Sequence, residues 1–206
     1  MTHLIKPRLL GCRYANPCKG YKWSLINPCK GCRRKMKNIF LIGMPSSGKT
    51  TLGKELARHI RYRFLDTDRL IIKSEGVEIN DIFSKYGEDY FRELEKNTLH
   101  GIRPDSKLII STGGGMPCFF DNMDFIKKNG ISIFLDVSVR IIYERMLRNN
   151  ANDRPLFKND DEELYAKLLE RYKTRYPMYS QADFVLKGSP TVHEILKLIE
   201  PQLSGS

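Results

Sequence analysis

The 206-residue sequence lacks any uninterrupted run of the roughly 18 apolar residues that a membrane-spanning helix requires. Its content of 41% hydrophobic and 29% charged residues is that of an ordinary globular protein. The length is sufficient for one domain, with or without an appendage, to bury a sizeable core. We therefore expect a protein that does not cross a membrane.

Acidic residues are missing from the first part of the chain. Residues 1–37 hold ten of the 35 Lys and Arg residues and no Asp or Glu, which leaves 25 basic and 24 acidic residues for the rest. The formal net charge of +11 therefore belongs almost wholly to this leader. Binding of nucleic acid through a basic surface is accordingly an argument about the leader alone, and we do not expect it of the nearly neutral body.

Cysteine is almost absent from the body, which holds only Cys118, whereas the leader holds Cys12, Cys18, Cys29 and Cys32. A body so poor in cysteine indicates a reduced, cytoplasmic domain. Four thiols could bind one zinc ion tetrahedrally. Only Cys29 and Cys32 form a CxxC pair, however, so the first knuckle of a zinc ribbon is missing.

The leader therefore remains open to several interpretations. It could be a disordered basic tail, a zinc-binding or nucleic-acid-binding segment, or upstream sequence translated before an authentic start at Met36. A secretory signal is not expected, because no continuous apolar stretch follows the basic residues. We divide the chain into a leader (1–36), a body (37–200) and a tail (201–206).

Short apolar runs alternate with longer amphipathic segments in the body, which is typical of βαβ units around a parallel sheet. Strands are predicted at 38–42, 63–65, 107–111, 131–135 and 184–186. Helices are predicted at 49–60, 79–86, 89–102, 139–149, 162–176 and 191–199. The expected fold class is α/β, with a five-stranded parallel sheet between two layers of helices and ligands bound beyond the carboxyl ends of the strands.

The first predicted strand runs directly into GMPSSGKT, residues 43–50, and a helical pattern follows. This is the GxxxxGK[ST] phosphate-binding loop in its strand–loop–helix context. Backbone N–H groups of such a loop surround the β-phosphate, the lysine reaches the β- and γ-phosphates, and the threonine hydroxyl binds magnesium. We therefore expect ATP and Mg²⁺ here, with nucleotide contacts from Gly43, Met44, Pro45, Ser46, Ser47, Gly48, Lys49, Thr50 and Thr51.

Two further features follow predicted strands. Asp66 and Asp68 stand two residues apart in FLDTDRLI, so on an extended chain both carboxylates would face one side of the strand end. One could bind magnesium and the other an acceptor hydroxyl, or either could simply cap a helix. The triple glycine, residues 113–115, costs roughly 1 kcal/mol per glycine in a regular element, so close approach of a ligand is the expected reason for it.

Taken together, the motifs GMPSSGKT, FLDTD, FRELE, STGGG, the DRPL of residues 153–156 and the RYPMY of residues 175–179 resemble the shikimate kinase family in order and spacing. The resemblance covers about residues 37–200. It implies a monomeric P-loop kinase that phosphorylates the 3-hydroxyl of shikimate with ATP in aromatic amino acid biosynthesis.

The resemblance also implies roles for single residues. Thr50 and Asp66 would hold Mg²⁺, and Asp68 would contact the shikimate hydroxyls as the candidate base. Arg92 and Arg175 would bind the shikimate carboxylate, and the ring would lie against Gly113, Gly114 and Gly115. Taken from charge alone, two guanidinium groups and one carboxylate provide the polarity that such an acid with several hydroxyls needs. Arg92 could otherwise be a surface residue paired with Glu95, and Arg175 a solvated helix end.

The polar, proline-containing segment 149–161 is predicted to be a mobile lid. Its closure would exclude water and bring Arg154 to the transferred phosphoryl group. Arg148 could stack on adenine or remain a solvated surface residue. Ser46 departs from the family, which often has glycine there.

Two alternatives to the shikimate kinase function remain. One is a gluconate-type sugar-acid kinase, which does not predict the RxPxY and GGG motifs. The other is a P-loop protein whose leader binds nucleic acid or zinc.

Overall fold

The computed structural model describes residues 37–151 and 162–204 of the chain. In this part of the chain five strands form one sheet in the order β2-β3-β1-β4-β5, and every neighbouring pair is parallel. The strands are β1 (Asn38–Ile42), β2 (Arg63–Asp66), β3 (Leu108–Ser111), β4 (Gly130–Asp136) and β5 (Phe184–Lys187). The predicted α/β fold with a five-stranded parallel sheet is confirmed.

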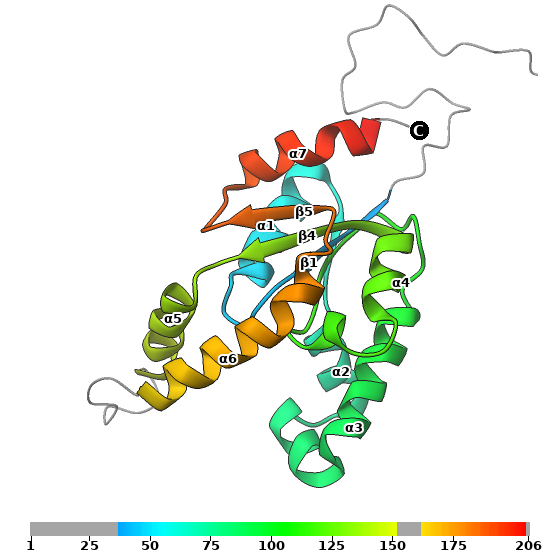
Figure 1. Cartoon of the computed structure of the whole chain (residues 1–206). Helices are drawn as coiled ribbons and strands as arrows, with labels where there is room; N and C mark the ends of the chain where they lie inside the picture. Colours follow the sequence, from blue (N-terminus) through cyan, green and yellow to red (C-terminus); the bar gives the residue numbers. More distant parts are fainter. Residues whose placement is uncertain (1–36, 152–161, 205–206) are drawn as a thin grey trace, which may run out of the picture. The chain divides into compact units, whose positions relative to one another are not determined.

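Helices cover both faces of the sheet, as Figure 1 shows. Helices α1 (Lys49–Ile60) and α7 (Val192–Ser204) pack on one face, where they meet Ile39 and Leu41 of β1. The other face, with Phe40 and Ile42, is covered by α3 (Ile79–His100), α4 (Asn122–Asn129), α5 (Val139–Ala151) and α6 (Glu162–Tyr179). Successive β1 residues point to opposite sides of the sheet, so a central strand that is buried on both faces reads as a continuous apolar run.

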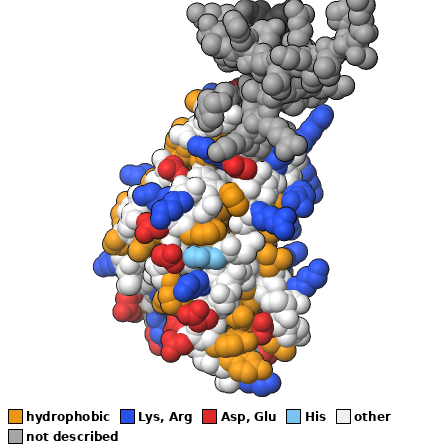
Figure 2. All heavy atoms as spheres, turned by 90° about the vertical axis from the view of Figure 1, so that its right-hand side faces the viewer, with side chains coloured by type: hydrophobic (Ala, Val, Ile, Leu, Met, Phe, Trp, Pro, Cys, Tyr) orange, Lys and Arg blue, Asp and Glu red, His pale blue; other side chains and the backbone are white. Residues whose placement is uncertain are grey.

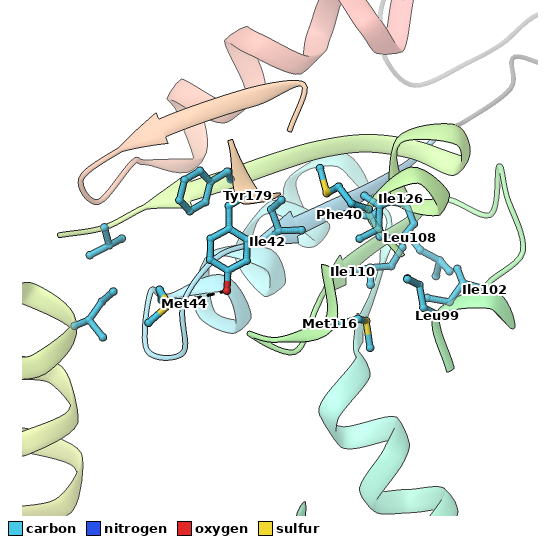
Figure 3. Packing of buried hydrophobic residues seen from close by; sticks show 14 of the residues in the cluster. Phe40, Ile42, Met44, Leu99, Ile102, Leu108, Ile110, Met116, Ile126 and Tyr179 are labelled. Atoms are coloured by element: carbon cyan, nitrogen blue, oxygen red, sulfur yellow. Dashed lines mark hydrogen bonds between the residues drawn. The ribbon is translucent and has the colours of Figure 1, made fainter. Parts of the chain in front are cut away.

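The core on the second face extends from the strands to the loops at their carboxyl ends (Figure 3). Tyr179 of α6 is fully buried there, and its hydroxyl lies 4.0 Å from the sulfur of Met44. Met44 belongs to the phosphate-binding loop after β1, so the same packing that stabilises the core also fixes one side of that loop.

The carboxyl ends of β1, β2 and β3 bring the three predicted motifs to one edge of the sheet. The phosphate-binding loop follows β1, Asp66 ends β2, and the triple glycine follows β3. The backbone N–H of Thr112 donates to the carbonyl of Leu41 at 3.1 Å, which continues the β1–β3 pairing up to the first glycine.

Two helices and one helical turn were not predicted. Helix α2 (Thr67–Glu75) begins directly after β2 and ends at Gly76, whose φ of 73° closes it in the left-handed region. The short η1 (Met116–Cys118) and α4 follow the triple glycine. The two helices predicted at 79–86 and 89–102 form the single segment α3, which is interrupted only by Gly87 with φ 81° and ψ 176°.

Several predicted boundaries differ at the chain's later elements. Helix α5 reaches Ala151, so the first residues of the segment predicted as a lid are helical. The remainder, with Arg154, lies outside the described residues, as does the leader. Helix α7 continues through Pro201 to Ser204, past the predicted end of the body, and Leu203 packs against the core.

The surface of the body agrees with its balance of charges. On the face drawn in Figure 2, Lys and Arg side chains occur together with Asp and Glu side chains. In the part of the chain that the structure describes, no helix combines the length and the apolar character needed to cross a bilayer.

Candidate active site

The phosphate-binding loop closes around the side chain of Lys49, the first residue of α1. The lysine Nζ donates to the carbonyls of Gly43 at 3.0 Å and Met44 at 2.8 Å, and lies 3.4 Å from the Ser47 hydroxyl. Gly48 enters the helix with φ 99°, a conformation that favours glycine. Burial lowers the pKa of Lys49 to about 8, although Asp68 and Asp66 favour its charged form. The ammonium group is thus held at the helix N-terminus, where phosphates are expected.

A cleft of about 640 Å³ opens over this loop. Six of its lining residues were predicted to contact the nucleotide, namely Ser46, Ser47, Gly48, Lys49, Thr50 and Thr51. Arg148, the candidate for adenine stacking, also lines it. Gly43, Met44 and Pro45, which were also predicted to contact the nucleotide, do not line the cleft. Gly43 and Met44 are buried, and Pro45 lies against Gly114. Leu52, Glu55, Arg145, Ser189 and Pro190 complete the lining and were not predicted.

Thr50 and Asp66 meet as the resemblance implies. The Thr50 hydroxyl donates to Asp66 Oδ2 at 2.8 Å, and Asp66 Oδ1 lies 3.4 Å from the backbone nitrogen of Arg69. Asp66 is therefore also the N-cap of α2. A hydroxyl and a carboxylate are oxygen ligands of the kind that Mg²⁺ takes alongside substrate phosphates, so this pair fits the ion.

Asp68 lies in the first turn of α2, so the prediction that it extends from a strand beside Asp66 is wrong. A helical turn, rather than strand alternation, places the two carboxylates near each other. Burial raises the pKa of Asp68 above its ordinary value, with a further contribution from Asp66, while Lys49 and Arg92 oppose the rise. Asp68 is therefore a better proton acceptor than a solvated aspartate.

The triple glycine packs against the polar side chains of the site itself. A Cβ atom at Gly113 would lie 2.5 Å from Asp68 Oδ1 and 2.8 Å from Glu95 Oε1. At Gly115 it would lie 2.5 Å from Arg92 Nη1, and at Gly114 2.7 Å from Pro45 Cδ. The sequence predicted close approach of a ligand, but the protein's own side chains already occupy the space that a larger residue would need.

Arg92 is held rigidly beside this backbone. Its Nη1 donates to Glu95 at 2.6 Å, and its Nη2 and Nε donate to Glu88 at 2.6 and 3.0 Å. The guanidinium also lies 4.0 Å from the centre of the Phe119 ring. The pair with Glu95 exists, but both side chains are buried, so the interpretation of Arg92 as a surface residue is wrong. Three of its five N–H groups are engaged, which leaves two for a ligand.

Glu95 is a buried carboxylate that pairs with Arg92 and lies near Asp68. Only 1% of Glu95 is exposed, and burial raises its pKa to about 6, against the opposing hydrogen bond from Arg92. Its 2.6 Å hydrogen bond with Nη1 fixes the orientation of the guanidinium. The sequence indicated this residue only as a helical neighbour of Arg92 and not as part of the site.

Arg175 reaches the same region from α6. It is half-buried, and its charge acts on Lys49, Glu95 and the Cys118 thiol. One turn later the hydroxyl of Tyr179 donates to the carbonyl of Gly114, which ties α6 to the triple glycine. Among the residues that the structure describes, Arg175 forms no ion pair. Its guanidinium therefore adds positive charge to the region that holds Lys49, Glu95 and Cys118.

Three of the lining residues that were not predicted come from elements that are distant from the phosphate-binding loop in the sequence. Arg145 belongs to α5, whereas Ser189 and Pro190 belong to the loop between β5 and α7, so their proximity to the phosphate-binding loop depends on the tertiary fold. Arg145 donates to the carbonyl of Ser46 and to the hydroxyl of Ser189. The position of Arg145 three residues before Arg148 was the only signal in the sequence.

Comparisons with known proteins agree with this geometry. A family model described as "Shikimate kinase" matches residues 45–200. A shikimate kinase from Clostridium botulinum is 43% identical over 164 residues, which cover 80% of this chain and 95% of that protein. One from Sulfurihydrogenibium sp. is 41% identical over 167 residues, covering 80% and 99% of the two chains.

Solved structures of similar proteins lead to the same family. The shikimate kinase of Bacteroides thetaiotaomicron has a TM-score of 0.73 and 36% identity, covering 80% of this chain and 98% of its own. The Acinetobacter baumannii enzyme, solved in complex with shikimate, has a TM-score of 0.71 and 32% identity, with 82% and 96% covered. Since the family model spans most of the sequence and these relatives are matched over nearly their whole length, the chain belongs to the shikimate kinase family.

Proposed function

We propose that the protein transfers the γ-phosphoryl group of ATP to the 3-hydroxyl of shikimate, giving ADP and shikimate 3-phosphate. The observation that carries this proposal is the convergence of two guanidinium groups and one carboxylate on the triple glycine, beside the phosphate-binding loop. Arg92 is anchored against Gly115, Asp68 lies against Gly113, and the charge of Arg175 on α6 acts on Glu95, the carboxylate paired with Arg92.

The two ends of this site differ in charge, as the two ends of shikimate do. Arg92 keeps two N–H groups for a ligand, and Arg175 has no acidic partner among the described residues. Guanidinium groups bind a carboxylate through paired, parallel hydrogen bonds. Asp68 supplies acceptor oxygens on the side toward Lys49, where the hydroxyl to be phosphorylated would lie.

The chemistry requires little beyond positioning and charge. Asp68 accepts the proton of the attacking hydroxyl, and its raised pKa suits it to that step. Lys49 stabilises the charge on the transferred phosphoryl group and on the β-phosphate, because the transition state is loose and spreads negative charge over these oxygens. Thr50 and Asp66 would hold Mg²⁺, which when bound neutralises phosphate charge.

We also propose roles for Arg154 and Arg148, an oligomeric state and a location in the cell. Arg154 lies outside the described residues, and we propose that it reaches the phosphates from a lid formed by the segment around it. Arg148, an exposed residue at the edge of the cleft, is proposed to contact the adenine. We further propose a monomeric enzyme of the cytoplasm that acts in aromatic amino acid biosynthesis.

A coupled ADP-release assay with shikimate, gluconate and quinate as acceptors tests this function. We expect turnover with shikimate to exceed that with the other two acids, and Lys49→Met to abolish it while the protein remains folded by circular dichroism. Preferred turnover of gluconate would favour the sugar-acid kinase alternative. Normal turnover by Lys49→Met would refute the site.

A further inference from the structure

One buried hydroxyl joins the start of α2 to the triple glycine. Thr67 is the first residue of α2, and its side chain is fully buried. Its Oγ1 accepts a hydrogen bond from the backbone N–H of Gly113 at 2.9 Å and donates to the carbonyl of Ser111 at 3.4 Å. The hydroxyl therefore contacts the backbone both at the end of β3 and at the first glycine.

The Thr67 hydroxyl lies where the sheet no longer supplies a backbone partner. The parallel pairing of β2 and β3 ends at Asp66 and Ser111, because the chain turns into α2 at Thr67. Gly113 is buried, and a buried backbone N–H without an acceptor is rare and costly. The helix itself does not need this hydroxyl, since the Asp66 carboxylate caps α2 by accepting from the backbone N–H of Arg69. The Thr67 side chain is thus available to hold the glycine backbone.

This contact holds the triple glycine against the helical turn that carries Asp68. Asp68 follows Thr67 directly, and a Cβ atom at Gly113 would lie 2.5 Å from Asp68 Oδ1. The buried Tyr179 of α6 holds the next glycine, because its hydroxyl donates to the carbonyl of Gly114. Hydroxyl groups from two different helices therefore fix the loop, and that of Thr67 is the one adjacent to Asp68.

We propose that Thr67 is a positioning residue for phosphoryl transfer: through the Gly113 N–H it keeps the triple glycine and the Asp68 carboxylate at one fixed distance. The inference rests on the proposed function, because it takes Asp68 as the base and the triple glycine as a wall of the acceptor site. Thr67 has no exposed surface, so it acts through Gly113 and Asp68 and does not touch the substrate.

The expected size of the effect follows from the acceptor that Gly113 would lose. Valine has nearly the shape of threonine but no hydroxyl, so in Thr67→Val the Gly113 N–H regains an acceptor only if the loop moves toward water. Only the molecules that keep the original loop position then hold Asp68 and the acceptor in the reactive arrangement. The preference against leaving a buried donor unpaired corresponds to a factor of about 5 to 150.

The kinetic test uses the full chain with ATP and shikimate. We expect Thr67→Val to lower kcat/KM for shikimate by about 5- to 150-fold, and Thr67→Ser, which retains the hydroxyl, to recover most of that loss. The affinity for Mg·ADP, measured by calorimetry, should hardly change in either variant, because Lys49 and Thr50 keep their contacts.

Thr112→Val is the matched control. Thr112 is also buried, and its hydroxyl donates to the carbonyl of Leu41 at 3.1 Å, on the side of β1. The same carbonyl accepts from the Thr112 backbone N–H, so valine there leaves no backbone group without a partner. We expect Thr112→Val to keep a normal kcat/KM, although it removes a hydroxyl one residue before Gly113. If Thr67→Val does not fold, Thr67→Ala takes its place, with an expected loss of about 2- to 10-fold because water can enter the space and partly replace the hydroxyl.

Amide hydrogen exchange, followed by mass spectrometry, tests the contact itself without reference to turnover. In the peptide that holds the triple glycine, exchange should be faster in Thr67→Val than in the unaltered protein, and Thr67→Ser and Thr112→Val should not share this increase.

The outcomes are distinct. A normal kcat/KM in Thr67→Val, or in Thr67→Ala if only that variant folds, would overturn the proposal, and so would unchanged exchange of the glycine peptide. Equal kinetic losses in Thr67→Val and Thr67→Ser, or in Thr67→Val and Thr112→Val, would overturn it as well, since the hydroxyl on Gly113 would then have no special role. If the unaltered protein failed to phosphorylate shikimate, the proposed function would fall, whereas the exchange result would still decide whether Thr67 holds the loop.

Discussion

Replacement of Arg175 by lysine separates binding of the acceptor from binding of the nucleotide. Arg175 is half-buried on α6 and forms no ion pair among the described residues, so the substitution leaves no buried carboxylate without its partner. Lysine keeps the positive charge that acts on Lys49 and Glu95, but it cannot form two parallel hydrogen bonds with a carboxylate. The change therefore removes the bidentate geometry and, within the protein, alters the hydrogen bond between Arg175 and Tyr179.

The expected magnitude follows from the loss of one hydrogen bond between charged groups, about 1.5 to 3 kcal/mol. This corresponds to a fall in kcat/KM for shikimate of roughly 10- to 150-fold. The affinity for Mg·ADP should barely change, because the phosphate contacts belong to the loop around Lys49 and the charge near that lysine is retained.

Steady-state kinetics with varied shikimate, and calorimetry with Mg·ADP, measure the two effects separately. Arg171→Lys, an exposed position one turn earlier on α6, is the matched control and should behave as the unaltered protein. A collapse of Mg·ADP binding with an unchanged KM for shikimate would place Arg175 at the nucleotide. A variant that is unchanged in both would show that Arg175 is only a solvated helix residue.

Four further predictions follow from the site. Asp68→Asn should lower kcat by about 10²- to 10⁴-fold, remove the acid limb of the pH profile and retain Mg·ADP binding; an unchanged kcat would exclude Asp68 as the base. Because the pKa of Lys49 is about 8, kcat/KM for ATP should fall as the pH rises through that value, and Lys49→Arg should move this limb to higher pH. Gly115→Ala places a methyl group 2.5 Å from Arg92 Nη1 and should lower kcat/KM for shikimate by about 10²-fold, which an unchanged kcat/KM would contradict. A chain that begins at Met36 should fold and turn over shikimate normally; inactivity of that chain, or a zinc requirement of the full one, would make the leader a functional module.

The parts of the fold that the sequence predicted best are those with local signals. Strand β1 and helix α1 have the predicted bounds, because an apolar run, the GxxxxGKT turn and an amphipathic helix follow one another without interruption. Helix α2 was missed because its boundary depends on contacts with distant residues. Buried Thr67 at its start accepts a hydrogen bond from the backbone N–H of Gly113 at 2.9 Å, and that contact requires β3 to lie beside β2.

The site was predicted in the same uneven way. Lys49, Thr50 and Asp66 meet as expected because their spacing around β1 and β2 is set by the sheet. The reason for the triple glycine was only half predicted, since its neighbours Asp68, Glu95 and Arg92 come from two different helices. Arg145 and Ser189 are 44 residues apart, so no local pattern could have joined them.

The most direct test of the account is to incubate the full-length protein with Mg·ATP and shikimate and to locate the phosphate on the product by ³¹P and ¹H NMR. The account predicts one product that carries phosphate on the 3-hydroxyl, formed in equal amount with ADP, and no such product with Lys49→Met. Release of ADP without phosphorylated shikimate, or phosphate on a different hydroxyl, would contradict the placement of Asp68 and the two arginines around the acceptor.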